Sequence, residues 1–339
     1  MRSSFPPIRQ KRDTAFTLLE VMITVVIVIV IMVSTLDIVS HVEHLWKSEA
    51  VDSFAEAQDA FSAMTQNLEN ASLEPYQDYA DSSGTFRTTS TSTFVPNHLA
   101  RRSDLAFICG PVSGPNGLLS PSGRITNGCG VFFAMPQGYT QTKANSGMEH
   151  LFNAMGYFIE FGNDTEAPSF LPSSAQRWRW RLKEIRQPSE SLQIFNLTSS
   201  SAWTQQLVSS PATTPVLANN VIALVLLPER AANDTGSPLA SNFHYDSRDS
   251  TTPLTFHQLP ARLRVALVVM DEPSAQILAA QNGSNPPAVV PPGLFQNAAQ
   301  LDADLAALDG ALTSQKIGHR LFQREILLTS SAWSNTPSP

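Results

Sequence analysis

Apolar positions follow a continuous pattern over the first part of the chain. Residues 21–33 are apolar except for Thr24, and the extended run 16–39 has the length of a helix that crosses a bilayer. From residue 40 to residue 73, apolar side chains recur at three- and four-residue steps, which is typical of an amphipathic helix. The pattern therefore predicts a transmembrane helix over 16–39 that continues into a stalk helix over 40–73.

The stalk helix is predicted to carry one apolar face on an otherwise polar surface. No Gly or Pro interrupts residues 16–72, and Pro75 ends the helical pattern. We expect the apolar face to pack under a sheet, with one polar residue, Gln58, filling a gap in it. The apolar members of this face are Val51, Phe54, Phe61, Met64, Leu68 and Ala71.

Beyond residue 73 the pattern changes to short apolar runs separated by polar stretches rich in Pro, Ser and Thr. Such runs predict a β-rich body over 74–334, followed by a short tail over 335–339. Residues 295–315 instead have the spacing of an amphipathic helix. The candidate strands are 105–109, 131–135, 156–161, 177–182, 192–195, 221–227, 262–270 and 320–328.

Within the candidate strand 177–182, "RWRWRL", basic and apolar residues alternate. Period two places Trp178, Trp180 and Leu182 on the inner face of a sheet and the three arginines on the outer face. A ladder of basic and aromatic residues can bind nucleic acid. We favour a solvated strand face, because the remainder of the chain is acidic.

The charge is distributed unevenly. The whole chain has a net charge of −7, yet residues 1–15 contain Arg2, Arg9, Lys11 and Arg12 against Asp13 alone. The acidic remainder argues against nucleic acid as a partner. The basic flank beside the apolar run indicates that the N-terminus is cytoplasmic, which would place the body on the other side of the membrane.

Motifs for catalysis are not found in the sequence. It contains no phosphate-binding loop of the Gly-x-x-x-x-Gly-Lys type, no Gly-x-Ser-x-Gly turn and no zinc-protease helix. His41, Glu43 and His44 lack metal-site spacing. We therefore expect no enzyme activity, with an anchored hydrolase using the polar loop 228–260 as an alternative.

Two cysteines and several aspartates are candidate sites. Cys109 and Cys129 each lie beside glycine in a body predicted to be periplasmic, which suggests a disulfide, with two buried free thiols as the alternative. Oxygen-rich segments can hold calcium, but we favour a solvated role and expect no cofactor. The aspartates concerned are Asp302, Asp304 and Asp309 in the predicted helix, and Asp246 and Asp249 in the loop 228–260.

A carboxylate, Glu20, stands at the start of the apolar run, where burial in hydrocarbon is costly. A secretory signal peptide does not explain it, because the run is long and no small-residue cleavage site follows it. The small residue, Ala15, precedes the run instead. The segment "AFTLLEV", residues 15–21, resembles the cleavage and methylation motif of type IV prepilins and of type II secretion pseudopilins.

This resemblance implies a fold and a set of site residues. The fold class would be α+β and type IV pilin-like: a long N-terminal helix, transmembrane in its first half, packed against a β-rich body. Residues 1–15 would be a leader that prepilin peptidase removes between Ala15 and Phe16, and Phe16 would then be N-methylated. The motif has Ala where Gly is usual. Glu20 would pair with the amine of Phe16 in a neighbouring subunit during assembly.

The body resembles the Verru_Chthon cassette protein C family, whose members are prepilin-type proteins encoded beside other pilin-like proteins. Segments that carry this resemblance include "GYFIEFGND", "RWRLKEIRQPSESL", "LPARLRVALVVMDEPSA" and "FQREILLTSSAWS". The resemblance extends from the N-terminal motif to about Trp333. It implies a pilin-like role and no known biochemical activity.

These observations together predict a minor pilin or pseudopilin. It would be held in the inner membrane by a single pass and would join a type II secretion-like or type IV pilus-like filament. Its partners would be prepilin peptidase, other pilins or pseudopilins of the filament and the inner membrane. The alternatives are a membrane-anchored binding domain that does not polymerise and an adhesin.

Overall fold

The computed structural model places most of the body and part of the N-terminal segment. It describes residues 18–88, 93–114, 117–119, 123–148, 150–163, 177–192, 194, 203–204, 214–236 and 238–337. In the first helix, side chains are described at 22–23, 25–32 and 53–69. The chain divides into two compact units, Met1–Ser48 and Glu49–Pro339, and the boundary falls within that helix.

Helix α1 is Leu18–Glu69. In the second unit its last turns bury a stripe at three- and four-residue spacing, as expected for one apolar face. Phe61 contacts Phe322 with ring centroids 5.9 Å apart, and Asn67 Nδ2 donates to the hydroxyl of Tyr157 at 2.7 Å. The stripe is Ala57, Ala60, Phe61, Met64 and Leu68.

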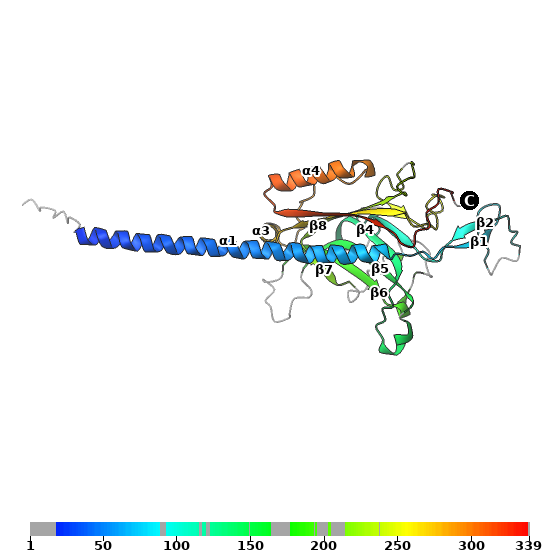
Figure 1. Ribbon diagram of the computed structural model, residues 1–339, viewed down its shortest axis with the longest axis horizontal. Coiled ribbons are helices and arrows are strands. Elements are labelled where there is room, and N and C mark those ends of the chain that lie inside the picture. Colours follow the sequence, from blue (N-terminus) through cyan, green and yellow to red (C-terminus); the bar gives the residue numbers. More distant parts are fainter. Residues whose placement is uncertain are drawn as a thin grey trace, which may run out of the picture. The chain divides into compact units, whose positions relative to one another are not determined.

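Six strands form the larger sheet, in the order β7-β6-β5-β4-β3-β9. Its long central strands are antiparallel, and β4 and β5 are buried along most of their length (Figure 1). A strand buried on both faces reads as a nearly continuous apolar run, as in "VFFAM" of β4. The strands are β3 Phe107–Pro111, β4 Ile125–Pro136, β5 Phe152–Gly162, β6 Arg179–Gln187, β7 Val216–Asn219 and β9 Tyr245–Asp246.

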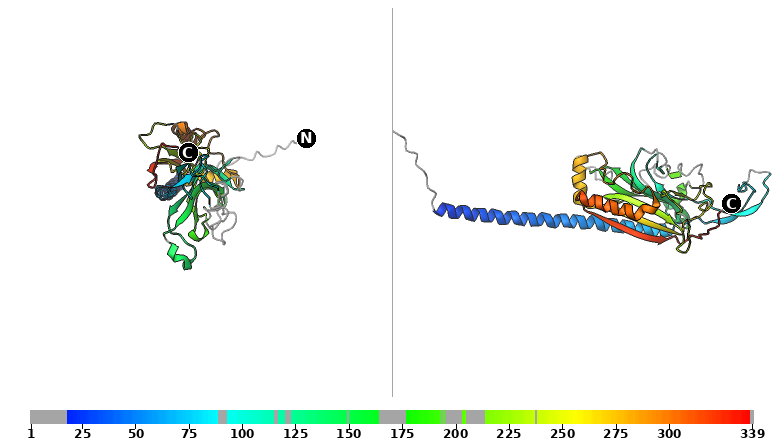
Figure 2. Two further views of the ribbon diagram at one scale, coloured as in Figure 1. Left: turned by 90° about the vertical axis from the view of Figure 1, so that its right-hand side faces the viewer. Right: turned by 90° about the horizontal axis from the view of Figure 1, so that it is seen from above.

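The second sheet has three antiparallel strands in the order β11-β10-β8. Helix α4 lies over it, with Leu301, Leu305, Leu308 and Leu312 buried (Figures 1 and 2). Helix α3 begins where β10 ends: Asp271 caps it by accepting from the N–H of Ser274, and Gly283 ends it at φ 58°. The elements are β8 Val221–Glu229, β10 Arg262–Met270, β11 His319–Leu327, α3 Glu272–Asn282 and α4 Leu301–Ser314.

The two sheets approach closely where β4 passes β8. Asn127 Nδ2 donates to the carbonyl of Ile222 at 3.3 Å. Gly128 has φ 70°, and a Cβ there would lie 2.9 Å from the carbonyl oxygen of Leu224. Only glycine fits both the backbone angle and the spacing, so this position allows the sheets to share one core.

A separate hairpin and several short 3₁₀ helices complete the body. Strands β1 Tyr76–Ala80 and β2 His98–Arg102 form a two-stranded antiparallel sheet. The segment after β9 packs against this hairpin, because Arg101 of β2 donates to the carbonyl of Phe256 at 2.9 Å. The 3₁₀ helices are η1 Lys143–Met148, η3 Ser189–Ser191 and η6 Ala298–Gln300.

The fold class predicted from the sequence is wrong as stated. Outside α1 the described chain is mostly β-sheet with short helices. Within the described residues, no helix has the length and apolarity required to cross a membrane. The boundary between the two compact units falls inside α1, so only the later part of this helix belongs to the body unit. Helical periodicity reports local conformation, whereas the fold class depends on long-range strand pairing that periodicity does not contain.

Other predictions divide into confirmed and wrong ones. Seven candidate strands coincide with β3, β4, β5, β6, β8, β10 and β11, and the candidate helix 295–315 contains α4. Of the candidate strand 192–195 only Leu192 and Ile194 are described, and neither of them is in a strand. The predicted apolar face is confirmed at Phe61, Met64 and Leu68, which are buried. Gln58 was placed on it wrongly, because Gln58 is exposed and Ala57 is buried instead.

Candidate functional site

The proposed processing site lies outside the described residues. Ala15 and Phe16 precede the first described residue, and Glu20 is in α1 but its side chain is not described. Cleavage, N-methylation and the assembly contact of Glu20 therefore stay predictions. The side chains of His41, Glu43 and His44 also lie outside the described set.

The apolar segment 22–32 of α1 is the part of the predicted assembly surface that the structure describes. Ten of its large apolar side chains are each between 51% and 62% exposed in the single chain. No Gly or Pro breaks the helix here, and the apolar residues surround it instead of forming a stripe. A helix that is apolar on all sides requires a covering surface. This segment is therefore the clearest unsatisfied surface among the described residues.

The predicted disulfide is not formed. Cys109 of β3 and Cys129 of β4 are free and buried. The strand register pairs Cys109 with Val131 and Pro111 with Cys129, so the two cysteines are diagonal neighbours. Diagonal positions lie about 7–8 Å apart, beyond the Cα separation of most disulfides. Burial raises the pKa of Cys129 to about 12 and raises that of Cys109 well above its usual range, so both are neutral thiols.

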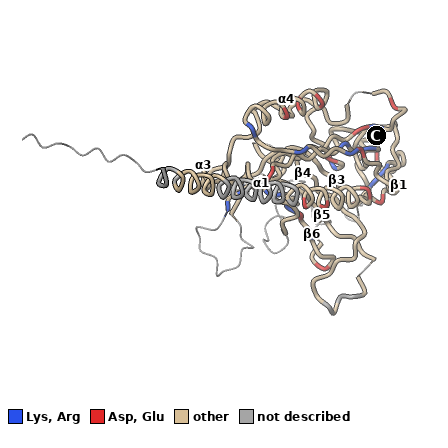
Figure 3. The backbone as a smooth tube through the Cα atoms, turned by 60° about the vertical axis from the view of Figure 1, so that its left-hand side comes forward, with Lys and Arg blue, Asp and Glu red and all other residues tan. Residues whose placement is uncertain are grey.

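The candidate calcium ligands do not come together. Asp302 pairs with Arg264 at 2.6 Å, and Asp304 Oδ2 accepts from the N–H of Phe295 at 2.8 Å. Asp309 Oδ1 lies 2.9 Å from Nε2 of His319. Figure 3 shows these acidic positions along α4, with basic positions on the strands nearby. No group of three or more metal-binding side chains occurs in the described part of the chain.

The loop aspartates have local roles. Asp246 Oδ1 accepts from the N–H of Arg248, and Asp249 accepts from the N–H and hydroxyl of Thr251. Burial alone would raise the pKa of Asp249. Hydrogen bonds from Thr251 and Thr252 outweigh burial and hold this pKa below its ordinary value. These contacts are those of turns that close on themselves.

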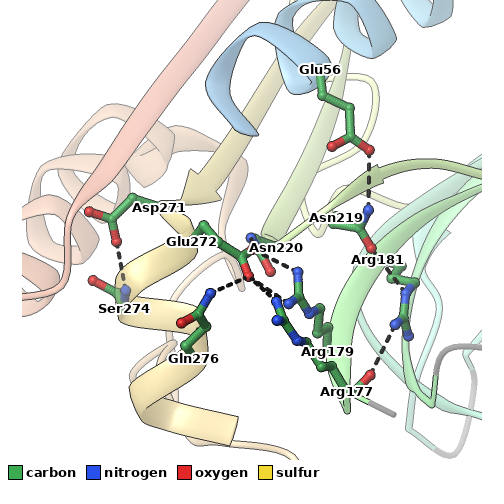
Figure 4. A network of polar contacts seen from close by, with 10 residues as sticks. All are labelled: Glu56, Arg177, Arg179, Arg181, Asn219, Asn220, Asp271, Glu272, Ser274 and Gln276. Atoms are coloured by element: carbon green, nitrogen blue, oxygen red, sulfur yellow. Dashed lines mark hydrogen bonds and ion pairs between the residues drawn. The ribbon is translucent and has the colours of Figure 1, made fainter. Parts of the chain in front are cut away.

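A polar network between β6 and α3 is a feature that sequence reasoning missed (Figure 4). The carboxylate of Glu272, in the first turn of α3, is bound by two arginines of the "RWRWRL" segment. Arg179 is bidentate, at 2.7 and 2.6 Å, and Arg177 lies at 2.9 Å. Asn220 and Gln276 also donate to it, at 2.8 and 3.0 Å. The predicted solvated face of this strand therefore faces a carboxylate.

The third arginine of that segment also corrects the prediction. Arg181 is buried and its guanidinium donates to Asn219 Oδ1 at 3.1 Å and to the carbonyls of Gly162 and Arg177 at 2.6 and 3.0 Å. Asn219 in turn donates to Glu56 of α1 at 3.2 Å. A buried guanidinium is tolerated when its donors are satisfied in this way.

Opposite pKa shifts characterise the two carboxylates of this network. Burial raises the pKa of Glu272, but hydrogen bonds from Arg179, Asn220 and Gln276 outweigh it and hold the pKa below the ordinary value. Burial raises the pKa of Glu56, and the hydrogen bonds from Asn219 only partly oppose it. The network is a structural joint between strands and helices.

The loop 228–260, proposed above for an anchored hydrolase, contributes to an open pocket of about 460 Å³. Arg248, Phe256 and His257 form one side of it, and Arg102 and Ser103 lie on the other. Ser103 Oγ is bound to backbone groups: it donates to the carbonyl of Leu73 and accepts from the N–H of Leu105. A hydroxyl held in this way is not placed as the partner of a histidine base, as nucleophilic catalysis requires.

Comparisons with protein-family models, with curated proteins and with solved structures found no match to this chain. The resemblances to prepilins and to the Verru_Chthon cassette protein C family therefore stay predictions from the sequence.

Proposed function

We propose that the chain is a minor pilin or pseudopilin, a subunit of a type II secretion-like or type IV pilus-like filament. The observation that carries the proposal is the segment "AFTLLEV" followed directly by a helix with exposed apolar side chains on all sides. The first feature resembles the motif that a prepilin peptidase recognises. The second is a surface that needs other apolar helices or lipid to cover it.

In this proposal the role of the protein is assembly, not catalysis. Cleavage after Ala15 creates a new amine at Phe16, which is methylated. Glu20 then pairs with the amine of a neighbouring subunit. A carboxylate in an apolar environment is costly unless it is paired, so assembly relieves a cost that the lone subunit carries. The apolar segment 22–32 packs against its counterparts in the filament.

The same proposal assigns a location and partners. The chain is held at the bacterial inner membrane by its apolar N-terminal segment, with the basic residues 1–15 in the cytoplasm and the body in the periplasm. Its partners are the peptidase and the other subunits of the filament. The bulk of the β-rich body favours a minor subunit, because a body of this size would crowd a repeated filament surface.

The first test is the mass of the N-terminal peptide of protein isolated from its native membranes. The proposal expects a chain that begins at Phe16 and carries one added methyl group. A chain that retains Met1, in cells that process another prepilin, would contradict the proposal. That second outcome would favour the alternative of an anchored binding domain that does not polymerise.

The second test concerns the assembly contact. Glu20→Ala is expected to leave processing intact and to reduce incorporation into filaments, measured by cross-linking to other subunits and by sedimentation of sheared filaments. Asp59→Ala is the matched control, because Asp59 is an exposed carboxylate of the same helix within the body unit. Equal incorporation of the two variants would remove the assembly role of Glu20 and favour the monomeric alternative.

A further inference from the structure

A pocket lies between the β1–β2 hairpin and the segment that follows β9. It has a volume of about 460 Å³, within the range of small-molecule sites. Phe86 of the hairpin connection and Arg102 at the end of β2 line one side, and Arg248, Phe256 and His257 line the other. These residues are far apart in the sequence, and only the fold brings them together.

The two sides of the pocket are fixed by arginine contacts. Arg101 donates to the carbonyl of Phe256 at 2.9 Å and to Oε1 of Gln258 at 2.5 Å, which holds the segment after β9 against β2. Arg102 Nη1 donates to Oδ2 of Asp78 at 2.7 Å. Arg248 Nη2 donates to the carbonyl of Asp104 at 2.5 Å. The pocket is therefore held in place by hydrogen bonds on both sides.

An aromatic cluster forms the apolar part of the pocket. The rings of Phe86 and Phe256 are stacked with centroids 6.5 Å apart, and the imidazole of His257 lies edge-on to Phe86 at 5.6 Å. The guanidinium carbon of Arg102 lies 5.1 Å from the centroid of the Phe86 ring. A flat apolar group entering the pocket would meet ring surfaces and a guanidinium plane.

Two nitrogen atoms in the pocket wall are buried and unpartnered. Within the described residues, neither Nε of Arg248 nor Nδ1 of His257 has a hydrogen-bond partner. Both atoms have almost no accessible surface, so they lie behind the surface that a ligand would touch.

The electrostatic environment of this corner favours an anion although the chain is acidic. Burial and then the charges of Arg248, Arg101 and Arg102 lower the pKa of His257 to about 4, so its ring is neutral at pH 7 and the positive charge comes from the arginines. Asp104 is the one acidic group in the pocket wall, and Asp78 is paired by both Arg87 and Arg102. Asp246, next to the wall, lies near Arg248.

We propose that this pocket binds an organic carboxylate that carries a flat apolar group. The carboxylate lies between the guanidinium groups of Arg102 and Arg248. The apolar group lies against Phe86 and Phe256. This inference goes beyond the proposed function and does not rest on it, because the pocket belongs to the body and uses none of residues 15–32.

Three small probes test the two halves of the ligand separately. The purified full-length chain in detergent is titrated calorimetrically with phenylacetate, with acetate, which lacks the ring, and with phenylacetamide, which lacks the charge. We expect saturable binding of phenylacetate and at least about 10-fold weaker binding of the other two, since each lost interaction of this kind is worth about 1–3 kcal/mol. Equal affinity for acetate and phenylacetate, or for phenylacetamide and phenylacetate, would overturn the proposal.

Variants then locate the site. Arg248→Gln and Arg102→Gln are each expected to weaken phenylacetate binding by about 10-fold or more. Arg320→Gln is the matched control, because Arg320 also lies over a phenylalanine, 5.3 Å from the ring centroid of Phe322, outside this pocket. Binding that survives both pocket substitutions, or that Arg320→Gln weakens equally, would contradict the assignment.

A measurement on the unmodified chain covers the case in which a pocket variant fails to fold. The chemical shifts of the His257 ring protons are followed by NMR at pH 7 with and without saturating phenylacetate. A phenyl ring bound against Phe86 and Phe256 lies beside this imidazole, so the shifts are expected to change. Unchanged shifts at saturation would place the ligand elsewhere and overturn the proposal.

Discussion

The two described parts of α1 have the same backbone conformation and opposite surroundings. In residues 22–32 every described large apolar side chain is more than half exposed, and these side chains surround the helix. In residues 53–69 the apolar stripe is no more than 6% exposed and polar residues occupy the other faces. Helical conformation is therefore common to both, and among the described residues only the second part is covered by other side chains.

The difference has an energetic consequence. Fully burying a large aliphatic side chain contributes about 1.5–3 kcal/mol. Ten half-exposed side chains in residues 22–32 thus leave on the order of 10 kcal/mol of potential burial unused in the single chain. This burial is available to a covering surface, whereas the stripe of residues 53–69 is already covered.

The largest expected effect comes from emptying the covered stripe. Met64→Ala or Leu68→Ala removes a fully buried side chain and leaves a cavity, so each should lower the free energy of unfolding by about 2–5 kcal/mol. Urea denaturation followed by tryptophan fluorescence measures it. Ile27→Ala is the control, because the same kind of truncation at an exposed position should change stability little. Equal losses at both positions would contradict the comparison.

A second prediction concerns the polar network between β6 and α3 in the body. Glu272→Gln keeps the shape of the side chain and removes the charge that two arginines bind, and we expect a loss of about 2 kcal/mol. The side chains of Arg179 and Glu272 are only 11% and 12% exposed. Glu69→Gln is the control, since the pair of Arg324 and Glu69 is 48% and 29% exposed and should contribute under about 1 kcal/mol. A larger loss for Glu69→Gln would reverse the ranking.

A third prediction uses the pH dependence of stability to distinguish the two carboxylates of the same network, Glu272 and Glu56. The pKa of Glu272 is lowered on folding, so its stabilisation is present above its unfolded pKa and is lost as the pH falls through its folded pKa. The pKa of Glu56 is raised, so its contribution is present at low pH and is lost as the pH rises through its folded pKa. Relative to the unmodified chain, Glu272→Gln should be destabilised most at pH 7, whereas Glu56→Gln should be slightly stabilised there.

Unfolding measured from pH 3 to pH 7 checks these signs. Both variants are expected to approach the unmodified chain as the pH falls below the two folded pKa values, because all the carboxyl groups compared are then neutral. A difference for Glu272→Gln that grows toward pH 3 would show that its carboxylate is not stabilised by the arginines.

The smallest effect on stability is expected in the exposed segment. Ile27→Asn should change the free energy of unfolding of the body by less than about 0.5 kcal/mol, because this side chain has no packing partner among the described residues of the single chain. If the proposed function is right, the same variant should reduce incorporation into filaments strongly, as measured by cross-linking. A variant that destabilises the body and assembles normally would contradict both parts of the comparison.

Sequence patterns predicted the elements whose signal is local. Runs such as "VIALVLL" and "RLRVALVVM" became β8 and β10, because a long β-branched run has few alternatives. Strands β1, β2, β7 and β9 were missed, since they are short or polar and depend on a partner far along the chain. Helix α3 was missed although its Asp271 cap and the Gly283 end are both visible in the sequence.

For the candidate sites too, the sequence predicted local features and not the contacts between distant residues. The alternation of "RWRWRL" correctly placed Trp180 and Leu182 in the core, but it assigned the arginines to solvent. Glu272, which binds two of them, is 93 residues from Arg179. The cysteines illustrate the same limit: both were expected at the edges of candidate strands, and only the strand register shows that they are diagonal neighbours. Periodicity tells which face a side chain occupies, not which residues that face meets.

The sequence alone determined the apolar N-terminal run, the motif at residues 15–21 and most of the strands, because each depends on neighbours within a few residues. The tertiary structure decided which apolar surfaces are covered, how Arg177 and Arg179 meet Glu272, and how Arg102, Arg248 and two phenylalanines enclose one pocket. These are contacts between residues distant in the chain. Their geometry follows from strand order and register, which no local pattern contains.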